Sequence, residues 1–382
     1  MSVDTLSLGD PYTVPTRHWH ALPDGRIQCD VCPRACKLRE GQRGLCFVRG
    51  RVDDQIVLAS YGRSSGFCVD PVEKKPLNHF LPGSSVLSFG TAGCNLACRF
   101  CQNWDISKSR EIDTLSGAAS PADLAHTAEA LGCRSVAFTY NDPVIFMEYA
   151  MDVADACRER GIKAIAVSAG FMNAAPRAEF YEHMDAANID LKAFTDSFYE
   201  KITFGKLGSV LETLEHLHHS TDVWFEITTL LIPGHNDSDA EIAEQCTWLV
   251  EHLGTDVPLH FSAFHPDFKM LDVPRTPPQT LRRARHIARE HGLRYVYTGN
   301  VHDPDGQTTT CPGCGTPVVV RDWYVIEGYD LADDGACRRC GTPVPGVYDG
   351  PVGTWGARRM PVRILNAMAP PSASGAGPAA PG

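Results

Sequence analysis

The sequence predicts an α/β fold, a full or partial parallel β/α barrel, from two observations. Between about residues 85 and 300, apolar runs rich in β-branched and aromatic residues alternate with amphipathic segments, as in repeated strand–helix units. The runs are apolar on both faces, which a buried parallel strand requires. Strands are expected at residues 86–89, 135–140, 163–168, 188–192, 223–232, 259–264 and 295–298. The active site of such a barrel lies at the carboxyl ends of its strands.

Two of the intervening helices have clear boundary signals. Ser120 suits an N-cap, Pro121 suits the first helical position, and Asp123 places an acid in the first turn. A later helix is expected to open at Thr276-Pro277-Pro278 and to end at the His-Gly pair of residues 291–292. Both signals agree with the alternation of strands and helices.

The composition disfavours several classes of protein. The chain has 382 residues, 43% hydrophobic and 21% charged, which is enough for one large domain with small modules. A net charge of −11 without basic runs disfavours a protein that covers nucleic-acid phosphates. The most apolar stretch, residues 224–233, is too short to span a membrane, and the N-terminus lacks a signal-peptide pattern. A cytoplasmic protein that does not bind membranes is expected.

The cysteines fall into groups whose spacing indicates metal chemistry, because disulfides are rare in the cytoplasm. Eleven of the fifteen form three groups, two of four and one of three. Four thiolates close a tetrahedral site, whereas three leave one position of a metal centre open. The other four are expected to be buried apolar residues. The groups are Cys29, Cys32, Cys36 and Cys46; Cys94, Cys98 and Cys101; and Cys311, Cys314, Cys337 and Cys340.

The group of three directly follows the first expected strand, as Cys94-x3-Cys98-x2-Cys101. Three thiolates can hold three irons of a [4Fe-4S] cluster and leave the fourth free to chelate a small molecule through an amine and a carboxylate. The reductive cleavage of S-adenosylmethionine (SAM) requires such a site. A structural zinc site is the alternative, but the position after a strand that opens a strand–helix series favours the cluster.

At this motif the sequence resembles the radical SAM superfamily, and Phe100 before the last cysteine matches its usual pattern. Residues 70–83, 138–143 and 188–192 look like the pyruvate formate-lyase activating enzyme group, and more closely like its AmmeMemoRadiSam branch. The resemblance covers about residues 29–300. It implies a radical SAM barrel that cleaves SAM at a [4Fe-4S] cluster and removes hydrogen from a protein or small-molecule substrate. It also implies an electron donor such as flavodoxin or ferredoxin.

The resemblance also implies further cofactor-binding positions. Residues 141–143, Asn-Asp-Pro, stand where the superfamily usually has a Gly-Gly-Glu motif for the SAM amino group, so the role of the Asp side chain departs from the pattern. Asp190 and Lys192, two residues apart, would point from the same face of a strand. The alternative is a surface pair in which the two charges only neutralise each other. For His265, the alternative is a core histidine whose hydrogen bonds are made within the protein. The cofactor positions are Asn141, Asp142, Ser168, Asp190, Lys192 and His265.

The two groups of four cysteines predict a metal module at each end of the chain. Cys311, Cys314, Cys337 and Cys340 form two Cys-x2-Cys-Gly turns with twenty-two residues between them, which is typical of a zinc ribbon. Cys29, Cys32, Cys36 and Cys46 suit either zinc or a second [4Fe-4S] cluster. This segment is too short to build its own core, so a metal is expected to fold it.

The sequence therefore predicts four parts: a Cys-rich segment at residues 1–75, a radical SAM barrel at 76–305, a zinc ribbon-like module at 306–362 and a disordered tail at 363–382. A radical SAM oxidoreductase is the function expected from these parts. A zinc-binding scaffold and a zinc-ribbon nucleic-acid-binding protein are the alternatives. Iron and sulfide content separates the enzyme from the scaffold, and a salt-dependent gel shift tests for nucleic-acid binding. The motifs leave the substrate, the reductant and the oligomeric state open.

Overall fold

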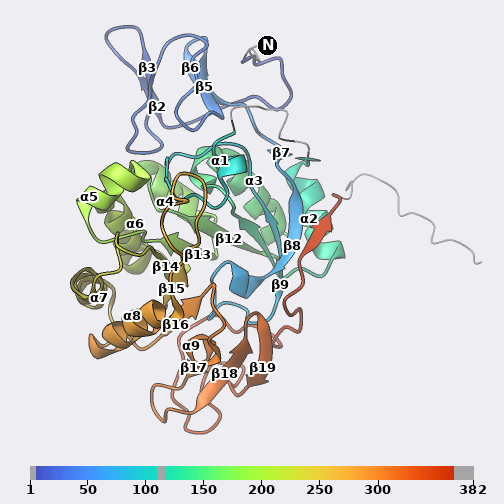
Figure 1. Ribbon diagram of the computed structural model, residues 1–382. Helices are drawn as coiled ribbons and strands as arrows, with labels where there is room; N and C mark the ends of the chain where they lie inside the picture. The colour runs from blue at the N-terminus through green and yellow to red at the C-terminus, as the bar shows by residue number, and fades with distance from the viewer. Residues whose placement is uncertain (1–5, 110–114, 116, 365–382) are drawn as a thin grey trace, which may run out of the picture.

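A nine-stranded sheet forms the centre of the molecule in the computed structural model, which describes residues 6–109, 115 and 117–364 (Figure 1). Its strand order is β16-β15-β14-β13-β12-β11-β9-β8-β20. The strands from β9 to β16 pair in parallel, and β8 and β20 add antiparallel at one edge. The two edge strands do not pair with each other in the described residues, so the barrel is partial and the predicted fold class is confirmed. The bounds are β8 (Phe67–Pro71), β9 (Ser85–Phe89), β11 (Ser135–Phe138), β12 (Lys163–Ser168), β13 (Ala186–Asp190), β14 (Trp224–Leu231), β15 (Leu259–Ala263), β16 (Val296–Gly299) and β20 (Met360–Val362).

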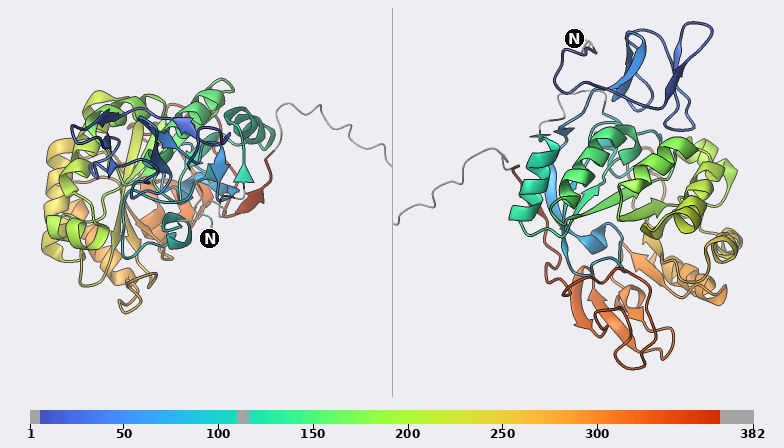
Figure 2. Two further views of the ribbon diagram at one scale, coloured as in Figure 1. Left: turned by 90° about the horizontal axis from the view of Figure 1, so that it is seen from above. Right: turned by 180° about the vertical axis from the view of Figure 1, so that it is seen from behind.

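Helices cover the outside of this sheet, as the two further views show (Figure 2). The predicted caps are present: the Ser120 side chain accepts from the backbone N–H of Asp123 in a capping box, and Pro278 opens α8. The helices are α1 (Trp104–Ser107), α2 (Pro121–Ala130), α3 (Met147–Arg158), α4 (Ala174–Glu182), α5 (Asp196–Phe198), α6 (Leu207–Ser220), α7 (Asp239–Leu253), α8 (Pro278–Glu290) and α9 (Pro304–Gln307), with shorter or irregular turns η1 (Val72–Lys74), η3 (Pro143–Phe146) and η4 (Tyr199–Thr203). No helix in the described part of the chain is both long and apolar enough to cross a bilayer.

The N-terminal segment forms a small module over the carboxyl ends of the strands (Figure 1). It has two three-stranded sheets, β1-β6-β5 and β2-β3-β4. Side chains fix it to the barrel: Asn173 donates to the carbonyl of Asp30 at 2.6 Å, and Arg49 forms a buried ion pair with Glu148 of α3. The strands are β1 (Val14–Pro15), β2 (Trp19–Ala21), β3 (Ile27–Cys29), β4 (Lys37–Leu38), β5 (Arg49–Val52) and β6 (Gln55–Leu58), followed by β7 (Arg63–Ser64), which pairs with β10 (Gly117–Ala118).

The C-terminal module lies at the opposite end of the barrel and contains β17 (Thr309–Thr310), β18 (Pro317–Asp322) and β19 (Val325–Tyr329). Its core includes Tyr295 and Tyr297 from the barrel, so the two parts share apolar contacts. Met360–Val362, expected within this module, returns to the main sheet as β20 beside β8. Most of the expected disordered tail, residues 365–382, lies outside the described residues. The four single cysteines are buried, as expected: Cys68, Cys133, Cys157 and Cys246.

One layer of the barrel, at the carboxyl end of β13 but near the amino ends of β15 and β16, is polar. The parallel register places Asp190, Thr228, His260 and Tyr297 side by side across β13 to β16. Residues that pair in this way share one face of the sheet. This layer connects the two cavities in which the chemistry is argued below.

Candidate active site

A cavity of about 310 Å³ opens at the carboxyl ends of the strands, where a β/α barrel places its active site. The loop that follows β9 contributes the three cysteines of the central motif. The loop that follows the neighbouring strand β11 and the end of β13 contribute polar residues. Seven of the predicted cofactor-binding residues line this cavity: Cys94, Cys98, Cys101, Asn141, Asp142, Asp190 and Lys192.

Backbone and side-chain hydrogen bonds hold the cysteine loop in place. The Asn141 side chain accepts from the backbone N–H of Thr91 at 3.1 Å and donates to the carbonyl of Gly93 at 2.8 Å. On the other side, the Asn95 side chain donates to the carbonyl of Phe171 at 2.9 Å. The loop is therefore anchored to the ends of β11 and β12, so three cysteines face one cavity from a fixed backbone.

The donor set and its surroundings fit an iron–sulfur cluster. Burial raises the pKa of the Cys94 thiol to about 12 and raises the pKa of Cys98 as well. A buried thiolate is therefore stable only beside positive charge, which bound iron supplies. Lys108 and Lys192 lie close enough to lower the pKa of Cys98 in part. The residues present thus match a group that is held by three thiolates.

Asp190 and Lys192 form an ion pair at the end of β13, with 3.0 Å between Nζ and Oδ2. Burial opposes the charged form of Lys192, but Asp190 and Cys98 outweigh burial and raise its pKa. The backbone N–H of Lys192 donates to the Tyr199 hydroxyl at 3.0 Å, and its carbonyl accepts from Asn236 at 2.7 Å. The pair thus lies on the wall of the cavity, with its backbone fixed on both sides.

Asp142 and Ser168 bind each other. The Ser168 hydroxyl donates to Asp142 Oδ1 at 2.9 Å, and the backbone N–H groups of Val144 and Ala169 also donate to this carboxylate. Asp142 therefore joins the loops after β11 and β12, and Ser168 is behind the wall of the cavity rather than in its lining.

His265 is not brought to this cavity. It follows β15, and its Nδ1 has a long contact of 3.4 Å with the carbonyl of Pro266. It is absent from the described lining residues. The role in SAM binding that the resemblance implies for His265 therefore has no support from its position.

The structure adds cavity residues that the sequence analysis did not name: Gln102, Asn188, Thr228, Ser262 and Asn300. Gln102 Nε2, Asn188 Oδ1 and Thr228 Oγ1 are buried and have no hydrogen-bond partner among the described residues. Unpaired buried polar atoms are costly, so a polar ligand that bonds to them would be favoured. Ser262 lies near the end of one expected strand and Asn300 just after another. This position was the sequence feature from which both residues could have been predicted as part of the site.

The four C-terminal cysteines form a compact group. Among the described residues, theirs is the one set of possible ligands with all donor atoms within 4.8 Å of one another. Cys311 and Cys340 have their sulfurs 3.5 Å apart, and Cys314 and Cys337 have theirs 3.9 Å apart. Four thiolates at about 2.3 Å from a tetrahedral zinc ion lie about 3.8 Å from one another. The group therefore fits a single ion of this size.

The four N-terminal cysteines line one small, enclosed pocket beside Arg49 and Asn95. Their sulfurs are not gathered as tightly as those of the C-terminal group. Burial raises the pKa of Cys46 to about 12, so these thiols also need a cation to ionise. The pocket adjoins the cysteine loop, since Arg34 Nε donates to the carbonyl of Asn95 at 2.9 Å.

The fold and site define a class of protein that sequence comparison identifies. Residues 89–246 match the Radical SAM superfamily. The chain is also 36% identical over 322 residues to an uncharacterized protein, MJ0808, of Methanocaldococcus jannaschii, covering 84% of this chain and 95% of that protein. This chain belongs to the radical SAM superfamily.

Two solved structures show distant similarity in fold. A domain of a pyruvate-formate lyase-activating enzyme from Bacteroides vulgatus is 17% identical, with a TM-score of 0.39, covering 43% of this chain and 98% of that chain. A radical SAM methyltransferase from Sphaerobacter thermophilus is 14% identical, with a TM-score of 0.46, covering 75% of this chain and 76% of that chain. Similarity at this level transfers neither activity nor substrate.

Proposed function

We propose that this protein is a radical SAM oxidoreductase that reductively cleaves S-adenosylmethionine at a [4Fe-4S] cluster held by Cys94, Cys98 and Cys101. The observation that carries the proposal is that these cysteines line one cavity with Asp190 and Lys192 at the carboxyl ends of parallel strands. When bound, the cluster and SAM supply one-electron chemistry that removes a hydrogen atom from a substrate. The chain's own residues hold, orient and shield that chemistry.

Specific residues around the cavity suit these tasks. The Lys192 ammonium can bind the carboxylate of SAM, and Asp190 can accept from ribose hydroxyls or from the amine. Asn141 keeps the cysteine loop at a fixed distance from β11 through its two hydrogen bonds. The unpartnered atoms of Asn188 and Thr228 offer an acceptor and a hydroxyl to a polar ligand.

We place the protein in the pyruvate formate-lyase activating enzyme group, in its AmmeMemoRadiSam branch. The motifs at residues 70–83, 138–143 and 188–192 support this placement. The proposal includes a cytoplasmic location, an electron donor such as flavodoxin or ferredoxin, and a protein or small molecule as substrate. A glycyl-radical partner enzyme is not required by it.

The two outer cysteine groups are proposed to bind different metals. The distances of 3.5 Å and 3.9 Å in the C-terminal group support one zinc ion. The looser N-terminal group supports a second [4Fe-4S] cluster over zinc, because a cluster separates its thiolates more widely than one ion does. The proximity of Arg34 to Asn95 places this group beside the central motif.

Anaerobic reconstitution followed by metal analysis and product detection tests this proposal. The full chain should bind at least about four irons and, with a reductant, convert SAM into methionine and 5′-deoxyadenosine. Cys98→Ala should abolish both the central cluster and the cleavage, because each cysteine holds a different iron. Cys157→Ala, a buried cysteine of α3, is the matched control and should retain both. A Cys98→Ala protein that still forms 5′-deoxyadenosine would contradict the proposal.

A further inference from the structure

A second and larger cavity, of about 720 Å³, lies on the open side of the partial barrel. The edge strand β16 borders it on one side and β8 with β20 on the other, while the turn between β18 and β19 covers it with Trp323 and Tyr324. Its volume is in the range of small-molecule sites. Lys74, Arg321 and Arg359 also line it, so the cavity is polar and carries several cationic groups.

This larger cavity is continuous with the cofactor cavity. Gln102, Tyr140, Ser262 and Asn300 line both of them. A molecule in the larger cavity would therefore lie directly against the site assigned to the cluster and SAM. That position is the one from which a substrate could lose a hydrogen atom.

His260 is in the wall of the larger cavity. It is two residues before Ser262 on β15, so both side chains point into the barrel, about 6.6 Å apart along the strand. It also shares a layer of the barrel with Asp190, two strands away, at a spacing of about 10 Å. His260 therefore faces the substrate side of the cofactor site.

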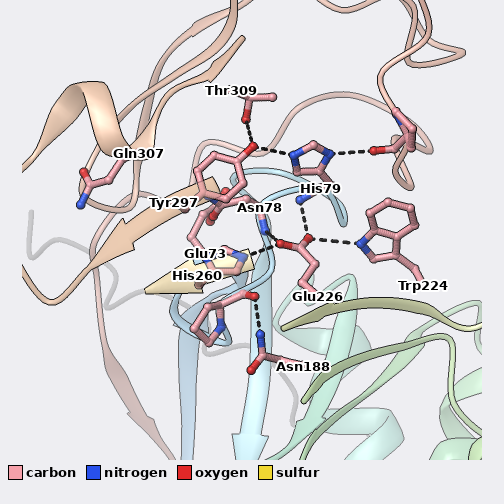
Figure 3. A network of polar contacts seen from close by, with 12 residues as sticks. Glu73, Asn78, His79, Asn188, Trp224, Glu226, His260, Tyr297, Gln307 and Thr309 are labelled. Atoms are coloured by element: carbon pink, nitrogen blue, oxygen red, sulfur yellow. Dashed lines mark hydrogen bonds and ion pairs between the residues drawn. The ribbon is translucent and has the colours of Figure 1, made fainter. Parts of the chain in front are cut away.

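Glu226 fixes the orientation and tautomer of His260 (Figure 3). Its carboxylate accepts from the backbone N–H groups of Asn78 and His79, at 3.0 and 2.7 Å, and from Trp224 Nε1 at 3.2 Å. The fourth donor is His260 Nε2, at 2.6 Å. Burial opposes ionisation of Glu226, but the hydrogen bonds that its carboxylate accepts, first that from His260 and then that from the backbone of Asn78, help to outweigh burial and lower its pKa.

An ionised carboxylate can only accept hydrogen bonds, so His260 carries a proton on Nε2. Its Nδ1 then holds the lone pair of the neutral ring. No hydrogen bond in the described part of the chain reaches that nitrogen, and it is not among the buried atoms that lack a partner. Nδ1 of His260 is therefore a basic nitrogen with access to the cavity.

The neighbouring His79 shows a contrasting arrangement. Its Nδ1 lies 2.7 Å from the carbonyl of Pro345 and must donate to it, so its Nε2 accepts from the Tyr297 hydroxyl at 2.6 Å. Both ring nitrogens are thus occupied, and burial lowers the pKa of His79 to about 4. His79 is a neutral structural residue, whereas His260 keeps one nitrogen open.

We infer that the larger cavity is the substrate site and that His260, oriented by Glu226, is a proton acceptor for a small polar substrate with an ionisable O–H or N–H group. This inference rests on the proposed function, which supplies the removal of the hydrogen atom. In the proton transfer, the substrate O–H or N–H bond breaks and its electron pair stays on oxygen or nitrogen. The proton forms a bond to Nδ1, the ring becomes an imidazolium, and Glu226 stabilises its charge. No electron enters or leaves in this step.

His260→Gln tests the role of the open nitrogen, because its amide can still donate to Glu226 while Nδ1 is lost. The full chain is reconstituted anaerobically, and 5′-deoxyadenosine is measured with and without the low-molecular-weight fraction of the cells that naturally make the protein. The fraction should accelerate the wild type. His252→Gln is the matched control, since His252 pairs with Glu215 at 2.7 Å on the outer surface.

The expected result is that His260→Gln loses the acceleration at least tenfold, whereas His252→Gln keeps both the cleavage without the fraction and the acceleration within about twofold of wild type. General bases typically contribute about a hundredfold or more. Equal acceleration in His260→Gln and wild type overturns the role of His260. No acceleration of the wild type overturns the small-molecule class. Absence of any cleavage in the wild type is instead the failure of the proposed function.

Chemical modification gives a second measurement that does not depend on folding of a variant. Diethyl pyrocarbonate reacts with neutral histidine nitrogens that it can reach, and mass spectrometry locates the product. His260 should be modified through the cavity, while His79 should remain protected until the protein unfolds. Equal protection of both histidines would contradict an open Nδ1.

Glu226 is a positioning residue, and its role has a spectroscopic signature. In Glu226→Gln the amide can donate to Nε2 of His260, which moves the ring proton to Nδ1. Nitrogen-15 spectra of histidine-labelled protein should show this change of tautomer at His260, with the signal assigned by its loss in His260→Gln. An unchanged Nε2–H tautomer would show that Glu226 does not set it.

Discussion

Gly93 and Cys46 are in direct backbone contact: a Cβ built on Gly93 would lie 1.9 Å from the carbonyl oxygen of Cys46. Gly93 precedes the first cysteine of the central motif, and Cys46 is the last cysteine of the N-terminal group. The two metal-binding segments therefore touch through their backbones. The contact requires glycine for a second reason, since φ at Gly93 is +84°.

Gly93→Ala should therefore destabilise the protein and separate these two segments. Overlap of this kind typically costs about 1–3 kcal/mol, in addition to about 1 kcal/mol for the left-handed backbone. Gly161→Ala is the matched control, because its φ is +71° but no atom lies within 4 Å of its Cβ. Urea unfolding of both variants isolates the contact. Equal loss of unfolding free energy in the two would show that the contact with Cys46 is unimportant.

The ion pair at the end of β13 gives a prediction about SAM binding. Asp190→Asn and Lys192→Met should each keep the cluster and weaken SAM, because each loses a charge-assisted hydrogen bond worth roughly 1.5–3 kcal/mol. That loss corresponds to about tenfold to a hundredfold in affinity. A titration of SAM followed by the electron paramagnetic resonance of the reduced cluster measures it.

A second Asp–Lys pair in the same sheet supplies the control for that titration. Lys163 and Asp185, 3.2 Å apart, lie at the amino ends of β12 and β13 and do not line the cofactor cavity. Lys163→Met should leave SAM affinity unchanged and cost under about 1 kcal/mol in stability, as for other exposed pairs. If Lys192→Met behaves like Lys163→Met, then Asp190 and Lys192 form only a structural pair.

The sequence predicted the barrel well because its strands are buried on both faces and its helices have explicit caps. All seven expected parallel strands are present with small boundary shifts, such as β13 at 186–190 rather than 188–192. β20 was missed because three residues that pair at a sheet edge carry no periodic signal; only the partner strand β8 defines them.

Candidate residues were predicted well where local spacing determines geometry and less well where tertiary contacts do. The cysteine motif and the Asp190–Lys192 pair reach one cavity because a loop and a strand end place them. His265 followed an expected strand, yet it is not among the described residues that line that cavity. His260 carried no motif at all, and only the contact with Glu226 from the neighbouring strand gives it a role.

The C-terminal group should bind zinc independently of the central cluster. Cys314→Ser removes one of four ligands at an exposed position. Its zinc content should be lower than the about one ion per chain expected of the wild type, because structural zinc sites need all their thiolates. Iron content and 5′-deoxyadenosine formation should remain. Cys133→Ala, a buried cysteine outside the three groups, should lose neither metal. Loss of iron without loss of zinc in Cys314→Ser would contradict the assignment.

His79 predicts how the stability of the protein depends on pH. Burial lowers its pKa to about 4, against an unfolded value of about 6.5, so the unfolded chain binds a proton that the folded chain does not. The contribution of His79 to the free energy of unfolding is therefore fully present above about pH 6.5 and decreases as the pH falls to about 4. Below that pH it does not change further. The shift corresponds to about 3 kcal/mol at most.

His79→Asn keeps a donor near the carbonyl of Pro345 but cannot titrate, so its unfolding free energy should fall less between pH 7 and pH 5. Urea unfolding at the two pH values measures the difference, and equal slopes in wild type and variant would assign the acid sensitivity to other groups.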